Sequence, residues 1–160
     1  MTENVEKMTE TAQKILLNGD LKYYDKLKLL LVEQALWNSS YLELLHKCES
    51  KMSYLQYMKI LADEKEYVLL LEQVKKHTEQ IYLYGKLLAV KYPTEICAIF
   101  TGQINKEAED AYGREAYGKV CSRILCFAEA GYKTESIEMK NKFKLKYKRK
   151  PAFVDELNNI

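Results

Sequence analysis

Apolar residues return every three or four positions along most of this chain, which is the period of a helix that buries one face. Residues 21–37 show the pattern most clearly, and we expect a helix there, with Asp20 as its N-cap after the Asn18-Gly19 break. A weaker pattern predicts a first helix over residues 4–17, with an inward face made by Val5, Met8, Ala12, Ile15 and Leu16.

Aromatic-led apolar clusters then recur at nearly constant spacing. They begin at Tyr41, Tyr54, Tyr67 and Tyr82, which are 13, 13 and 15 residues apart. Residues that cap helices or favour chain reversal separate the clusters, at 38–40, 49–51, 63–65 and 77–78. One short helix and one turn fit each spacing, so residues 20–92 predict a row of short antiparallel helices.

Helices this short cannot bury their apolar faces alone, which is typical of an α-solenoid. The predicted fold class is therefore all-α, an array of short antiparallel helices with a tetratricopeptide-like arrangement. The repeat is shorter than a tetratricopeptide unit and lacks its sequence pattern, so the prediction concerns the architecture and not membership of that family.

Longer helices are expected over residues 93–158. Pro93 suits the first position of a helix that ends at the Tyr112-Gly113 break, with Ile96, Ile99, Phe100 and Ile104 inward. A second helix begins at Arg114 and ends at Gly131 as its C-cap. Its inward face is predicted to hold Tyr117, Val120, Cys121, Ile124, Leu125, Phe127 and Ala128.

The segment NKFKLKYKRKPAFVDEL, residues 141–157, alternates lysine with apolar residues and so begins with the period of a β-strand. No second strand candidate is present to pair with it, and a lone strand would leave its backbone groups unpaired. We therefore favour a helix over residues 133–147, with Ile137, Met139, Phe143 and Tyr147 inward. Pro151 suits the first turn of a short terminal helix that ends near Leu157.

Length and composition fit one helical domain over residues 1–160. Six glycines and two prolines are too few for an all-β fold, and a net charge of +2 creates no global field for nucleic acid or acidic membranes. The chain opens on polar residues without a secretory signal, and no apolar window is long enough to span a membrane. We expect a cytoplasmic protein whose four cysteines are free thiols.

Residues that carry chemistry are sparse and poorly spaced for a site. On a helix, His46 would diverge from Cys48, and Cys121 with Cys126 would be a poor chelating pair. Cys97 or Cys48 could meet His77 in space as a nucleophile pair, but any chain with four cysteines and two histidines allows that, and we do not favour it. No glycine-rich phosphate loop is present. We expect no catalytic activity, no metal and no cofactor.

The thirteen tyrosines have two interpretations. Interleaved with lysines, they would form a stacking surface for nucleic acid. At inward helix positions, their rings would instead pack in the core or line a groove, with the hydroxyl near the rim. We favour packing, and predict a partner groove lined by Tyr41, Tyr54, Tyr67 and Tyr82.

The basic tail also has two interpretations. Residues 133–150 include eight basic and two acidic residues, a local charge of +6. Such a patch makes phosphate contacts whose affinity depends on salt, whereas a solvated helix face with lysine stems along apolar surface is the simpler explanation. The candidate nucleic-acid-binding residues are Lys140, Lys142, Lys144, Lys146, Lys148, Arg149 and Lys150.

Five stretches share a resemblance in their order along the chain: EQALWNSSYL (33–42), YVLLLEQVKK (67–76), KYPTEICAIF (91–100), REAYGKVCSRI (114–124) and LKYKRKPAFVDEL (145–157). Together they resemble the C-terminal helical region of bacterial SWIM-type zinc-finger proteins, over residues 20–158. The finger itself, a Cys-x-Cys followed by a Cys-x-His, is absent, so its zinc binding does not carry over. The resemblance implies an all-α, right-handed superhelical array that works by interaction.

The leading expectation is a non-catalytic helical scaffold that binds a protein or peptide partner and no membrane. The alternative is a nucleic-acid-associated accessory domain that uses the basic C-terminal helix. An enzyme is the last of the three expectations.

Overall fold

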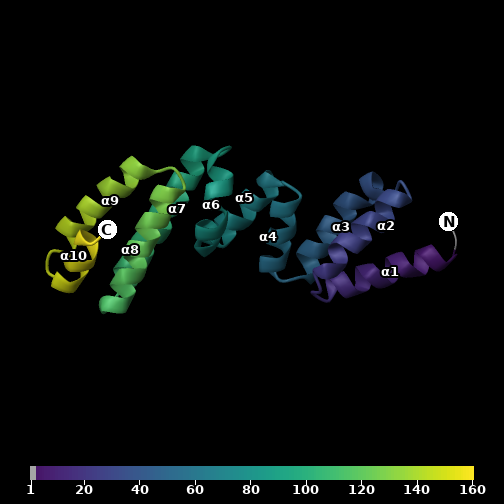
Figure 1. Cartoon of the computed structure of the whole chain (residues 1–160), viewed down its shortest axis with the longest axis horizontal. Coiled ribbons are helices and arrows are strands. Elements are labelled where there is room, and N and C mark those ends of the chain that lie inside the picture. The colour runs from purple at the N-terminus through teal and green to yellow at the C-terminus, as the bar shows by residue number, and fades with distance from the viewer. Residues whose placement is uncertain (1–2) are drawn as a thin grey trace. The chain divides into compact units, whose positions relative to one another are not determined.

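The structure is a computed structural model that describes residues 3–160, and over that range the chain forms helices and no strand (Figure 1). The prediction of an all-α fold is confirmed. In chain order the elements are α1 (Glu3–Leu17), α2 (Lys22–Glu33), α3 (Trp37–Lys51), α4 (Tyr54–Asp63), α5 (Tyr67–Lys76), the 3-10 helix η1 (Thr78–Gln80), α6 (Ile81–Ala89), α7 (Pro93–Asp110), α8 (Arg114–Glu129), α9 (Lys133–Lys146) and α10 (Pro151–Asn158).

The chain divides into two compact units, Met1–Glu66 and Tyr67–Ile160. In the first unit, α1 packs against α2, both contact α3, and α3 contacts α4. The division falls inside the range 20–92 for which short repeats are predicted. The single-domain organisation, with repeats over 20–92 and longer helices over 93–158, stays a prediction.

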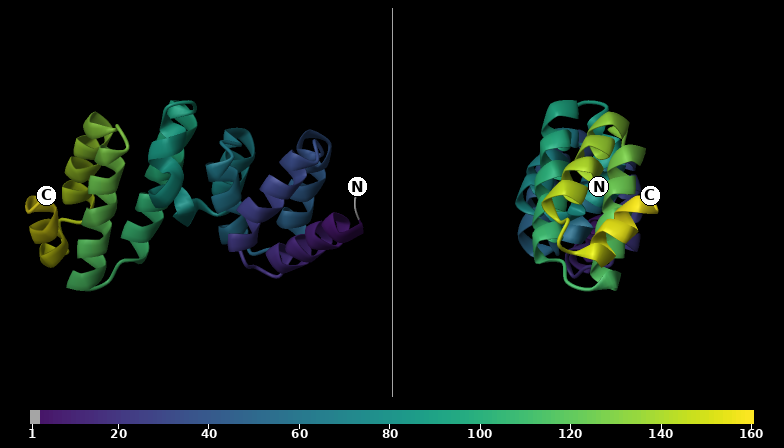
Figure 2. Two further views of the ribbon diagram at one scale, coloured as in Figure 1. Left: turned by 45° about the vertical axis from the view of Figure 1, so that its right-hand side comes forward. Right: turned by 90° about the vertical axis from the view of Figure 1, so that its left-hand side faces the viewer.

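The second unit is built from neighbouring helices that reverse direction. Figures 1 and 2 show α8 and α9 side by side and antiparallel, with α10 against both. The rings of Phe100 and Phe127 stack at 5.0 Å in its core, and Tyr132 stacks on Phe127 at 5.1 Å. These rings join α7, α8 and the turn before α9. No helix among the described residues has the length and apolar character needed to cross a membrane.

Both prolines begin helices, as predicted. Pro93 is the first residue of α7 and Pro151 the first of α10, where the missing backbone N–H costs nothing. The segment with strand-like alternation is helical in α9, which confirms the choice of helix. Met139, Phe143 and Tyr147 are buried, but Ile137 is 58% exposed and its predicted inward position is wrong. Ser136 faces inward instead, because the buried stripe of α9 runs along 136, 139 and 143.

Three other predicted positions need correction. Met8 and Leu125 point outward rather than inward. Asp20 lies one residue before the N-cap of α2, which is Leu21, although the Asp20 carboxylate does accept the amide of Lys22 at 3.1 Å.

The predicted break at residues 38–40 is also wrong, because α3 already begins at Trp37. The chain reverses earlier, at Ala35, which has a φ of +56°. The Leu36 amide donates to the Leu31 carbonyl at 2.8 Å, and the Ala35 amide to the Val32 carbonyl at 2.9 Å. This is a Schellman motif, whose positive φ normally selects glycine. A glycine at position 35 would have indicated the turn in the sequence, whereas an alanine does not.

The same motif ends α4, where Lys65 has a φ of +61° and the backbone amide of Glu66 donates to the Leu61 carbonyl. We predict that Ala35→Gly and Lys65→Gly each stabilise the protein by about 0.5–1 kcal/mol, because glycine removes the left-handed strain at some entropic cost. Chemical denaturation measures the change. The matched control is Ala130→Gly, at the right-handed C-cap of α8, which should not stabilise; equal effects at all three positions would contradict the prediction.

Candidate functional site

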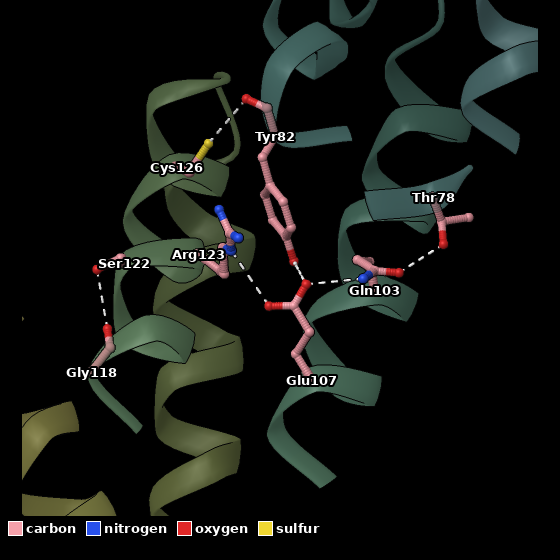
Figure 3. Close-up of polar contacts among 8 residues, drawn as sticks. All are labelled: Thr78, Tyr82, Gln103, Glu107, Gly118, Ser122, Arg123 and Cys126. Carbon is pink, nitrogen blue, oxygen red and sulfur yellow. Dashed lines mark hydrogen bonds and ion pairs between the residues drawn. The ribbon is translucent and has the colours of Figure 1, made fainter. Parts of the chain in front are cut away.

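Glu107 of α7 is the centre of the polar contacts that join helices of the second unit (Figure 3). Its Oε1 accepts hydrogen bonds from the Tyr82 hydroxyl and from Gln103 Nε2, each at 2.9 Å. Its Oε2 pairs with Arg123 Nε at 3.4 Å. Thr78 Oγ1 donates to Gln103 Oε1 at 2.7 Å, which extends the network to η1.

Helix spacing explains how these side chains meet. Gln103 and Glu107 lie one turn apart on α7 and so share a face. The guanidinium of Arg123 lies 4.0 Å from the centre of the Tyr82 ring, which adds a cation–π contact. Burial, and then the carboxylate of Glu107, raise the pKa of Tyr82 above its ordinary value, so its hydroxyl remains protonated, and a donor, even in alkaline solution.

The first unit contains a similar pair. The Tyr41 hydroxyl donates to Glu66 Oε1 at 2.9 Å, and the two residues are 25 apart in sequence, as are Tyr82 and Glu107. Lys28 Nζ contacts both oxygens of Glu64, at 2.7 and 2.9 Å. Glu64, Glu66 and Glu107 are each already bonded to a side chain from a helix of the same unit. The arrangement is typical of a structural crosslink between helices rather than of a catalytic acid or base.

Glu107→Ala is expected to destabilise the protein by about 2 kcal/mol, because three donors lose their common acceptor and two of them are partly buried. The control is Glu109→Ala on the same helix. Glu109 forms an exposed ion pair with Lys146, and such pairs contribute little to stability, so this variant should unfold almost as the wild type does. Thermal unfolding followed by circular dichroism compares the two; equal stability would show that the Glu107 network is not a crosslink.

The cysteines and histidines do not gather into a site. Within residues 3–160, no group of three or more His, Cys, Asp or Glu side chains is placed to hold a metal ion. Burial is the main cause that raises the pKa of Cys48 and of Cys121 to about 11. Thiols with such a pKa are poor nucleophiles at neutral pH. His46 is exposed while Cys48 is buried, so the two point apart.

The seven basic residues predicted to bind nucleic acid are spread around α9 and the turn after it. Three of them contact their own chain: Lys140 Nζ donates to the Ile160 carbonyl, Lys146 pairs with Glu109 at 2.8 Å, and Lys150 donates to the Ala111 carbonyl at 3.2 Å. The four whose side chains make no hydrogen bond or ion pair with the described part of the chain are Lys142, Lys144, Lys148 and Arg149. At 100° per residue, the lysines of α9 fall on both sides of its buried stripe rather than on one face.

The four tyrosines predicted to line a groove differ in exposure. Tyr41 and Tyr82 are half-buried, and their hydroxyls bind Glu66 and Glu107. Tyr67 is half-buried with Lys91 Nζ 4.5 Å from its ring centre, and Tyr54 is exposed at the start of α4. Tyr41 and Tyr54 belong to the first unit, and Tyr67 and Tyr82 to the second. The groove they were predicted to form stays a prediction.

A groove that sequence patterns missed lies between α1 and α2. It has a volume of about 530 Å³ and is lined by Lys7, Met8, Thr11, Ala12, Ile15, Tyr23, Lys26, Leu29 and Leu30. Met8 is 52% exposed and Leu29 58%, although both are large apolar side chains. One feature of the sequence could have indicated the groove: the apolar residues of α2 cover more of the helix surface than its buried face. Leu29 and Leu30 lie outside the face that Tyr24, Leu27 and Leu31 bury.

Comparison of the chain with protein-family models, with curated proteins and with solved structures finds no match.

Proposed function

We propose that this protein is a non-catalytic helical scaffold that binds a protein partner through the groove between α1 and α2. The observation that carries the proposal is the groove itself, in which large apolar side chains of two helices remain open to solvent. A contiguous exposed apolar surface on a folded protein marks an interaction site more often than an isolated apolar residue does. The volume of about 530 Å³ is within the usual range of a binding pocket.

A wider architecture belongs to the same proposal. We propose that the helices follow one another as a tetratricopeptide-like, right-handed α-solenoid, related to the helical region of SWIM-type zinc-finger proteins, in a cytoplasmic protein. The contacts between successive helices within each unit, and the antiparallel pair α8 and α9 of the second unit (Figures 1 and 2), support this, since solenoids stack helical hairpins. The resemblance of residues 20–158 supports the relationship.

Site-specific photo-crosslinking tests the proposed function. A photoreactive amino acid replaces Leu29 in the full chain, which is expressed in cells of its source. The matched control replaces Leu42, which lies on α3 of the same unit, is 75% exposed and does not line the groove. We expect one reproducible partner at Leu29 and none at Leu42.

The captured protein is then purified and its binding reconstituted. Binding by the wild type that Leu29→Glu abolishes and Leu42→Glu preserves would support the scaffold. Capture of the same proteins at both positions, or reconstituted binding that both variants retain, would overturn it.

The second candidate is nucleic-acid binding by the C-terminal basic residues. The observation that favours it is that Lys142, Lys144, Lys148 and Arg149 have no acidic partner in the described part of the chain. A titration of the full chain with generic duplex and single-stranded DNA at increasing salt tests it. Phosphate contacts predict an affinity that falls steeply with salt and that Lys148→Ala with Arg149→Ala weakens. Absence of binding at low salt would exclude this function.

A further inference from the structure

The groove between α1 and α2 has the form of a site for a third helix. Leu16 of α1 and Leu27 and Leu31 of α2 are buried and do not line the groove, and both helices contact α3. The groove lies on another side of the same pair, where none of the elements that the structure describes in the first unit covers Met8 or Leu29. Two helices whose exposed apolar side chains form a groove can bury those side chains against a third helix that packs along it, as in helix-in-groove recognition.

The charged residues that line the groove are both basic. Lys7 and Lys26 line it, and none of its lining residues is acidic. Two acidic side chains of α1, Glu6 and Glu10, line a separate pocket instead. Lys26 Nζ lies 4.7 Å from the centre of the Tyr23 ring, so this cation is held at the edge of the apolar surface. A partner with carboxylates beside its apolar face would complement this edge.

We propose that the groove binds an acidic amphipathic helix of a partner protein, with leucine-like side chains on one face and Asp or Glu beside them. The inference rests on the proposed function and specifies its partner. The helix α2 has 12 residues, which span about 18 Å, so a partner helix of about 14 residues covers the groove. A hollow between two helices suits a helix better than it suits a flat lipid surface.

Fluorescence anisotropy of the full chain with two synthetic peptides tests the inference. Both have about 14 residues, with leucine at helical spacing on one face. One has glutamate at the flanking positions and the other has lysine there. We expect the acidic peptide to bind, and the basic peptide to bind about tenfold more weakly or not at all.

Variants locate the binding. Leu29→Glu should abolish binding of the acidic peptide. Lys26→Glu should weaken binding of the acidic peptide about tenfold and strengthen binding of the basic peptide. The controls are Leu42→Glu and Lys59→Glu, at exposed positions of the same unit outside the groove, and both should bind as the wild type does.

Three outcomes would overturn the acidic-helix inference: equal binding of both peptides, acidic binding that Leu29→Glu leaves unchanged, or no peptide binding. Preferential binding to anionic lipid vesicles, or self-association that Leu29→Glu removes, would also overturn it by naming a different occupant. If a partner captured at Leu29 still binds through the groove in any of these cases, the proposed scaffold function survives. If neither peptides nor captured partner bind there, both proposals fail.

Discussion

Phe143→Ala is expected to lower the free energy of unfolding by about 3–4 kcal/mol. Phe143 is fully buried on α9, with the Tyr147 ring 5.5 Å away edge-on and the Phe153 ring of α10 at 6.3 Å. Phe153 in turn stacks on Tyr117 of α8 at 4.6 Å. Removing the Phe143 ring therefore leaves a cavity at the junction of three helices, which the surrounding rigid rings cannot readily fill.

The control is Leu145→Ala, two residues along the same helix. Leu145 is 76% exposed, so its loss should change stability by less than about 0.5 kcal/mol. Far-UV circular dichroism during urea unfolding is the appropriate measurement, because the only tryptophan, Trp37, belongs to the first unit. Equal midpoints for the two variants would be incompatible with the packing of α9 described here.

Gly85→Ala is expected to destabilise the protein by about 2–3 kcal/mol, although alanine is normally the better helix former. A Cβ at position 85 would lie 2.5 Å from Cε2 and 2.7 Å from Cζ of Phe100. The Phe100 ring is fully buried between neighbouring rings, Phe127 at 5.0 Å and Tyr82 at 5.9 Å, so it has little room to move aside. The added methyl group must therefore push α6 and α7 apart.

Gly102→Ala on α7 is the matched control. A Cβ there would meet no atom within 4 Å, so the helix should gain about 0.5–1 kcal/mol from the lower backbone entropy of alanine. The two identical substitutions are thus expected to change stability in opposite directions. Thermal unfolding compares them, and a stabilised Gly85→Ala protein would show that α6 and α7 are not in close contact at this position.

Helix formation could be predicted from the sequence because its signals are local. The apolar period of three to four residues, the prolines at 93 and 151, and the break at Tyr112-Gly113 all act within a few residues of their own position. The turn at Ala35 escaped prediction for the same reason. An alanine has no local preference for positive φ, so the strain there is compensated by contacts made elsewhere in the fold.

The candidate sites were less predictable than the helices. The sequence identified Tyr41 and Tyr82 as candidate groove residues, but it could not identify their acceptors, which lie 25 residues further along, in the turn before α5 and on α7. Nor could it show that Lys140, Lys146 and Lys150 contact their own chain while their basic neighbours do not. The groove was missed because the exposure of Met8 and Leu29 depends on which side of the α1–α2 pair another helix covers.

By itself, the sequence determined that this chain is helical and where most of its helices begin and end, because backbone dihedral preferences and side-chain period are short-range properties. Only the tertiary structure decided which apolar residues are covered, why Gly85 is a glycine, and which carboxylates Tyr41 and Tyr82 bind. Those features depend on contacts between helices distant in sequence, and the energy of such a contact is set by the distance between atoms rather than by the residues alone.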